Sequence, residues 1–192
     1  MAENFFEKWT KVMFQPDKFY EKLPRATGFK EPTLFAFIVI SVIYLLLGIL
    51  ILLIGSLYGL SQGLTYAGIV TAVLVAGVIY AVGCSFAILF IYLWSAILHL
   101  FVNIFKGRGD YKETFTAVAY ATAPNVLSFI PIISFFAGIY GIVLQVIGIH
   151  KRHKLSVGKS VGVVLIPVAI ISVIFLVIYF FMIASLIAGG YM

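Results

Sequence analysis

The chain has 192 residues, of which 63% are hydrophobic and only 10% are charged. Soluble domains average roughly 45–50% apolar and about 25% charged residues, so this chain has too few charges to cover the outside of a soluble protein. The composition excludes a soluble enzyme, a disulfide-stabilised secreted domain and an ordinary DNA-binding module. No Asp, Glu, Lys or Arg occurs from Pro32 to Phe105, from Thr114 to His150 or after Lys159. Each tract exceeds the roughly 20 residues that cross a bilayer as a helix, so we expect an all-α, polytopic integral membrane bundle.

The first 31 residues carry five acidic groups and lack the apolar core of a signal peptide. We expect residues 1–31 to form an uncleaved cytoplasmic segment and residues 32–192 the membrane domain. Phe5, Phe6, Trp9, Val12 and Met13 share one face at helical spacing. This face predicts an amphipathic helix that either lies in the membrane interface or packs under the bundle, with Trp9 as a candidate lipid or partner contact.

The apolar tracts predict five transmembrane segments. The tract 66–105 is expected to cross once as one long helix, and the tract 114–149 to cross twice. Splitting the latter near Pro131 gives helices of about 17 residues, or about 25 Å, so a short or re-entrant hairpin is the open alternative for the third and fourth segments. The predicted spans are about 33–54, 66–105, 114–130, 132–149 and 157–186.

All 13 Lys and Arg residues fall in three clusters, within 1–31, 106–113 and 150–160. Cytoplasmic loops are the ones enriched in Lys and Arg, so one topology should place all three clusters inside the cell membrane, with the amino terminus cytoplasmic and the carboxyl terminus outside. The net charge of +6 therefore indicates no nucleic-acid partner. Basic residues near the last span are candidates for binding anionic lipid or a partner, the alternative being simple retention of positive charge inside. These candidates are Lys151, Arg152, Lys154 and Lys159.

The predicted spans contain no charged residue other than Lys159, near the start of the last span, which argues against a pump or an ion-coupled transporter. His99, Asn125 and Gln145 are the candidate polar intramembrane site, and a passive path for a small neutral solute is the alternative function. Each also has a structural interpretation. His99 is hydrogen-bonded near an interface, Asn125 satisfies backbone groups that Pro124 leaves free, and Gln145 makes an interhelical hydrogen bond.

No catalytic, metal-binding or cofactor-binding constellation can be assembled from three scattered histidines and one cysteine, so we expect a protein that is not an enzyme. Asp110 and Glu113 are spaced as the N-cap and N3 residues of a helix. Small residues recur at four-residue spacing, as in Gly83/Ala87 and Ala137/Gly141. Such pairs indicate close helix packing, with a homo-oligomer interface as the alternative.

Three segments together resemble the Yip domain family of Ypt-interacting membrane proteins. They are Trp9…Pro16…Phe19-Tyr20, the stretch 115–124 continuing to Pro131, and the stretch 148–160. The resemblance covers nearly the whole chain and implies five spans, a cytoplasmic amino terminus, no known catalytic residues and a role in membrane organisation or trafficking.

Eukaryotic members of the family bind Rab-type small GTPases and have a longer cytoplasmic amino-terminal region. The short region here resembles prokaryotic members and favours a plasma-membrane protein. The sequence thus predicts a non-enzymatic scaffold whose partners are membrane lipids, other membrane proteins or a small GTPase.

Overall fold

The computed structural model describes residues 4–61, 63 and 66–188, and every regular element among them is helical. Of these helices, α3, α4, α6 and α7 are long and apolar enough to cross a membrane. The predicted all-α polytopic fold is therefore confirmed. The elements are α1 (Phe5–Phe14), α2 (Pro16–Lys22), α3 (Lys30–Ser61), α4 (Tyr66–Ile104), α5 (Tyr111–Tyr120), the 3₁₀ helix η1 (Ala123–Leu127), α6 (Pro131–His153) and α7 (Val157–Ala188).

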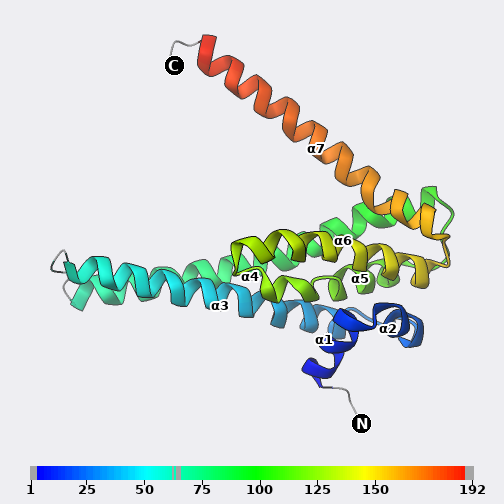
Figure 1. Cartoon of the computed structure of the whole chain (residues 1–192), viewed down its shortest axis with the longest axis horizontal. Helices are drawn as coiled ribbons and strands as arrows, with labels where there is room; N and C mark the ends of the chain where they lie inside the picture. The colour runs from blue at the N-terminus through cyan, green and yellow to red at the C-terminus, as the bar shows by residue number, and fades with distance from the viewer. Residues whose placement is uncertain (1–3, 62, 64–65, 189–192) are drawn as a thin grey trace.

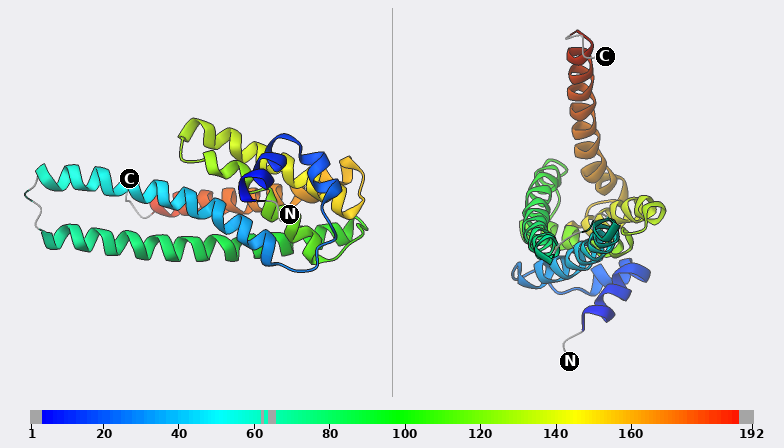
Figure 2. Two further views of the ribbon diagram at one scale, coloured as in Figure 1. Left: turned by 90° about the horizontal axis from the view of Figure 1, so that it is seen from below. Right: turned by 90° about the vertical axis from the view of Figure 1, so that its left-hand side faces the viewer.

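Two hairpins of unequal length form the body of the molecule (Figure 1). Helices α3 and α4 run antiparallel along its full length, and α4 is a single helix of 39 residues, as expected for the tract 66–105. The shorter hairpin of α5, η1 and α6 packs beside the half of α3–α4 that lies nearest α1 and α2 (Figure 2). All of the connections α2–α3, α4–α5 and α6–α7 consequently lie at one end.

The third predicted span, 114–130, is not one continuous helix. Helix α5 has 10 residues, about 15 Å at 1.5 Å per residue, which is half of the hydrocarbon thickness of roughly 30 Å. Pro124 lies in the first turn of η1 and Pro131 begins α6. A proline cannot donate a helical backbone hydrogen bond, so both positions favour an interruption of the α-helix. The third segment is therefore short, as the alternative allowed, whereas the fourth, α6, has 23 residues and is long and apolar enough to cross a membrane.

Helices α1 and α2 pack under the bundle through their apolar face. Val12 is fully buried, the Trp9 indole Nε1 donates to the carbonyl oxygen of Ala123 at 2.9 Å, and the Tyr140 hydroxyl donates to that of Met13 at 2.5 Å. The side chains of Phe6 and Phe14 remain 70% and 71% exposed. The predicted amphipathic helix is therefore held to η1 and α6, while two of its aromatic residues stay free.

Helix α7 leaves the bundle after its first turns (Figures 1 and 2). Ser160, Val163 and Val164 are fully buried near its start, whereas most of its large apolar side chains between Ile170 and Ile187 are exposed. In a membrane this apolar surface is a surface for lipid, since burial against hydrocarbon satisfies it as well as a protein core would. Only the start of α7 therefore helps to shape the end of the molecule where the connections meet.

Candidate functional site at the basic end

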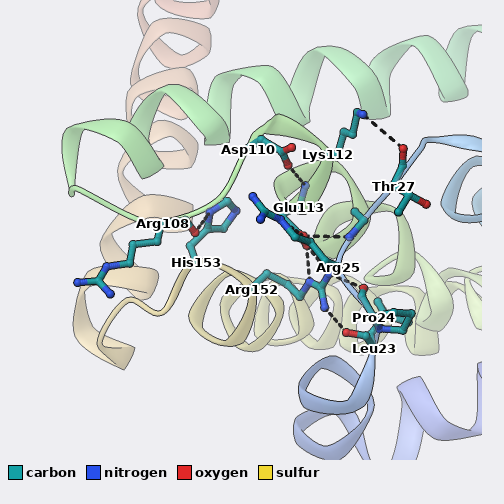
Figure 3. Close-up of polar contacts among 11 residues, drawn as sticks. Leu23, Pro24, Arg25, Thr27, Arg108, Asp110, Lys112, Glu113, Arg152 and His153 are labelled. Atoms are coloured by element: carbon teal, nitrogen blue, oxygen red, sulfur yellow. Dashed lines mark hydrogen bonds and ion pairs between the residues drawn. The ribbon is translucent and has the colours of Figure 1, made fainter.

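The three basic clusters meet at one end of the molecule, which we call the basic end and define as residues 23–29, 105–113 and 150–156. The backbone N–H of Arg108 donates to the carbonyl oxygen of His153 at 2.9 Å, which joins the α4–α5 loop to the end of α6. The ammonium group of Lys112 donates to the carbonyl oxygen of Thr27 at 3.3 Å (Figure 3). Seven of the 13 cations, drawn from all three clusters, are thus brought together in the fold.

Glu113 and Arg152 form a buried ion pair at the centre of the basic end. Their side chains are 5% and 7% exposed, and both Nε and one terminal nitrogen of the guanidinium contact Oε2 of the carboxylate. The Nε–Oε2 distance is 2.6 Å. Removing two charges from water costs several kcal/mol per ion, so such a pair is stable only where further hydrogen bonds satisfy both groups.

Those further hydrogen bonds come from the segment between α2 and α3. Arg152 also donates to the carbonyl oxygens of Leu23 at 2.6 Å and Pro24 at 2.8 Å. The backbone N–H of Ala26 donates to Oε1 of Glu113 at 2.9 Å (Figure 3). The ion pair therefore ties α5 and α6 to the chain that leads from the amino-terminal helices into the first spanning helix.

A chain of hydrogen bonds through two histidines lies beside this pair. Nδ1 of His153 is 3.0 Å from the carbonyl oxygen of Arg108, and the Thr114 hydroxyl lies 2.9 Å from Nε2 of His153 and 2.8 Å from Nδ1 of His99. A carbonyl oxygen only accepts, so His153 donates from Nδ1. With both rings neutral, the Thr114 hydroxyl donates to Nε2 of His153 and accepts from His99. These hydrogen bonds join α4, α5 and α6 where the three helices meet the basic end.

Standard helix-capping motifs end α4 and begin α5. Lys106 donates to the carbonyl oxygen of Asn103 and Gly107 to that of Val102, which together make a Schellman motif. The αL position of this motif is held by Lys106, with φ +59°, where glycine is usual. Asp110 caps α5 by accepting from the backbone N–H of Glu113, so the predicted N-cap is confirmed. The Glu113 side chain does not return to Asp110, because its carboxylate is bonded to Ala26 and Arg152.

A pocket of about 550 Å³ opens over the ion pair. Five basic and two acidic residues line it, and they come from all three basic clusters. Tyr20 lies at its wall, where burial raises the pKa of the phenol, so the group stays protonated and donates to the carbonyl oxygen of Ala117 at 3.1 Å. The lining residues are Tyr20, Glu21, Arg25, Arg108, Gly109, Glu113, Lys151, Arg152 and Lys154.

The basic residues singled out from the sequence have different surroundings. Lys151 lies 3.6 Å from Asp17 and 3.4 Å from Glu21, and the buried Arg152 is bonded internally. Lys154 and Lys159 are exposed, and their side chains make no hydrogen bond or ion pair with the described residues. Trp9 lies away from the pocket, against η1. Their predicted role in lipid or partner binding stays a prediction.

The polar residues predicted within the membrane do not form one site. Asn125 and Gln145 line a groove of about 570 Å³ between α4, η1 and α6, whereas His99 is bonded to Thr114. Gln145 accepts from the Trp94 indole at 3.0 Å, which confirms its interhelical hydrogen bond. The Asn125 side chain makes no hydrogen bond to the described residues, so the backbone role predicted for it is not seen.

Two residues that matter at the basic end were not predicted to do so. Arg25 is 80% exposed with its Nε 4.0 Å from Oε1 of Glu113, and Glu113 was assigned only a helix-capping position. The sequence does hold one signal for Glu113: it is the last charged residue before a charge-free tract. An acidic group there, next to an excess of bases, points to an ion pair but not to its partner.

The fold and the basic end define a multi-pass α-helical integral membrane protein with its cations gathered at one end. The chain matches the Yip1 domain over residues 10–188, which is nearly its whole length, and it belongs to the Yip1 domain family. No curated protein and no solved structure shows significant similarity to the chain. The resemblance noted in the sequence is therefore confirmed, and the match begins inside the predicted amino-terminal segment.

Proposed function

We propose that this Yip1-family protein is a non-enzymatic membrane scaffold of the cell membrane whose basic end faces the cytoplasm and engages anionic lipids or partner proteins. The observation that carries the proposal is the convergence of all three basic clusters on one end. Positive charge is retained on the cytoplasmic side, so this end is the cytoplasmic one. The amino terminus is then cytoplasmic, and α7 carries the chain to the outer side.

The basic end offers several cations that internal pairing does not neutralise. Arg108 and Lys154 are exposed without an acidic partner among the described residues, as is Lys159 just beyond the basic end in α7, and Arg25 has only its long contact with Glu113. A basic residue near an anionic membrane surface contributes about 1 kcal/mol of attraction. The surface thus suits lipid headgroups and acidic protein segments.

The proposal can be tested with the full-length protein and a variant in which Arg25, Arg108, Lys154 and Lys159 are all replaced by Gln. Both are purified from their host membrane in a mild detergent, and co-purifying proteins and phospholipids are quantified. We expect the variant to retain severalfold less anionic lipid or partner protein. A control that exchanges Arg for Lys and Lys for Arg at the four positions keeps every charge and should behave like the unaltered protein.

Two results would contradict the scaffold. One is an unaltered protein that retains neither a partner nor anionic lipid above the level of neutral lipid; the other is equal retention by the variant. A Rab-type GTPase, the partner class that the resemblance to eukaryotic members implies, is tested in the same assay by adding the GTPase in its GTP-bound and GDP-bound states. Binding of only one state would identify it as a regulated partner.

The groove that contains Asn125 and Gln145 favours a second candidate, passage of a small neutral solute. Its polar groups lie between α4, η1 and α6, where the surrounding helices are apolar. Flux of glycerol or urea into proteoliposomes tests this function, with Gln145→Leu and Asn125→Leu as blocking variants. Flux no faster than in empty liposomes would exclude it for these solutes.

A further inference from the structure

We propose that the pocket at the basic end is a binding site for a phosphate monoester group, carried by the headgroup of an anionic membrane lipid. The inference deepens the proposed function and rests on it, because it assumes that the basic end contacts the membrane surface. It assigns a ligand class and specific residues to a contact that the proposed function describes only as electrostatic.

Charge is the first argument. Within the pocket, Glu113 is fully engaged by Arg152 and by the backbone of Ala26, so this carboxylate is not available to the other cations. Glu21 lies 3.4 Å from Lys151. Of the other lining cations, Arg25 has only its 4.0 Å contact with Glu113, and Arg108 and Lys154 have no acidic partner among the described residues. Like charges gathered in one concave surface raise the local concentration of an anion.

The chemistry of the cations is the second argument. A guanidinium group presents paired donors that match two phosphate oxygens, and an ammonium group adds a point charge with three donors. The Arg25 side chain is 80% exposed and has only the 4.0 Å contact with Glu113, and Lys154 is exposed at the end of α6. Figure 3 shows the Arg108 side chain extending away from Arg152, so Arg25 and Lys154 are the residues we assign to direct contact.

Position is the third argument. Lys154 follows α6 directly, and Arg25 precedes α3 by five residues, so both lie where the apolar helices end. That level corresponds to the headgroup region of a bilayer. The pocket volume of about 550 Å³ is within the range of ligand sites, roughly 300–1,000 Å³, and it exceeds what a phosphate group needs. The ion pair of Glu113 and Arg152 gives the pocket a rigid floor.

The experiment compares two variants that lose the same charge. Arg25→Gln/Lys154→Gln removes the two assigned cations, and Lys18→Gln/Lys106→Gln removes two exposed cations that do not line the pocket. Binding of short-chain phosphatidic acid, short-chain phosphatidylcholine and inorganic phosphate to the full-length protein in detergent is followed by native mass spectrometry and by Trp fluorescence. Unfolding temperatures of both variants without ligand verify that each is folded.

We expect phosphatidic acid to bind the unaltered protein at least 10-fold more tightly than phosphatidylcholine does. The pocket variant should lose 10-fold or more of this affinity, the control variant less than 3-fold, and Arg25→Lys/Lys154→Arg should restore it. Equal losses in the two double variants would overturn the pocket while leaving electrostatic engagement of the basic end intact. If the unaltered protein shows no preference for the anionic lipid, the pocket is overturned as a lipid-phosphate site. If the unaltered protein in addition retains no partner protein, the proposed function fails as well.

Competition by inorganic phosphate distinguishes a lipid headgroup from free phosphate as the occupant of the pocket. A lipid is held in addition by its acyl chains, so we expect inorganic phosphate to compete only at concentrations at least 10-fold above those of phosphatidic acid. Competition at equal concentrations, lost in the pocket variant, would overturn the lipid as occupant and assign the pocket to the free anion.

Discussion

Arg152 connects three parts of the chain that are far apart in sequence. Its guanidinium group contacts Glu113 of α5 and the carbonyl oxygens of Leu23 and Pro24, from a position on α6. A single side chain can do this because guanidinium carries five N–H donors in a planar arrangement. Arg152 therefore sets the relative position of the amino-terminal helices and the shorter hairpin.

Replacing Arg152 by Gln should leave the Glu113 carboxylate buried without its counter-ion. Breaking a buried pair from one side costs about 3–5 kcal/mol, so we expect a large loss of unfolding free energy in detergent. The double variant Glu113→Gln/Arg152→Met should recover part of that loss, because no uncompensated charge is left. Lys154→Met is the control, and this exposed position should change stability by less than about 0.5 kcal/mol. A loss at Arg152 no larger than this control would contradict a stabilising pair.

Lys106 holds a backbone conformation that favours glycine. Its φ of +59° lies in the left-handed region, which costs an L-residue roughly 1–2 kcal/mol. We predict that Lys106→Gly raises the unfolding free energy by about 0.5–1 kcal/mol, after the entropy that glycine adds to the unfolded chain is subtracted. Lys106→Gln removes the same charge but keeps a residue with a Cβ in the strained left-handed conformation. A gain in both variants would trace the effect to charge and contradict the backbone explanation.

At the scale of elements, helix α6 approaches α5 and α2 closely at one glycine. A Cβ added to Gly148 would lie 2.8 Å from that of Ala117 and 3.1 Å from the Tyr20 ring, whereas one added to Gly138 of the same helix would meet nothing within 4 Å. We expect Gly148→Ala to lower stability by about 1–3 kcal/mol through overpacking. Gly138→Ala should leave stability unchanged or slightly raised. Thermal unfolding of both variants tests the contact, and equal effects would contradict it.

The small residues that recur at four-residue spacing do not all contribute to helix packing within the chain. At Gly83 an added Cβ would lie 2.6 Å from the Tyr44 ring, and at Gly141 it would lie 3.4 Å from the carbonyl oxygen of Ala121, so both serve packing within the chain. Gly77 has nothing within 4 Å of such a Cβ. A spacing pattern alone cannot separate these cases, because it does not say which face of a helix meets a neighbour. A homo-oligomer through the open positions stays a prediction.

At the scale of the whole molecule, the orientation in the membrane follows from the position of the cations at one end. We predict that cysteines at Lys106 and Lys159 react with a membrane-impermeant maleimide from the cytoplasmic side only, while one at Gln62, between α3 and α4 in the chain, reacts from the outside only. The assay uses intact cells and inverted vesicles, with the native Cys84, which is 3% exposed, replaced by Ala. Labelling of Lys106 and Lys159 from opposite sides would overturn the arrangement.

The sequence by itself determined the class of the protein, the long continuous helix of residues 66–104 and the capping of α5 by Asp110. The class and the capping depend on local composition, hydropathy and short-range spacing, and the single long helix depends in addition on how the cations are distributed among the loops. It also indicated that the cations share one side, because membrane insertion acts on each loop separately.

The tertiary structure alone decided that the third predicted span is a short helix followed by a 3₁₀ turn, that Glu113 pairs with Arg152, and that Arg25 and Lys154 line one pocket. Glu113 and Arg152 are 39 residues apart, and Arg25 and Lys154 are further apart still. Pairing over such distances is set by how the helices pack, and the free energy that selects one partner among 13 cations arises only when the chain is folded and the pair is removed from water.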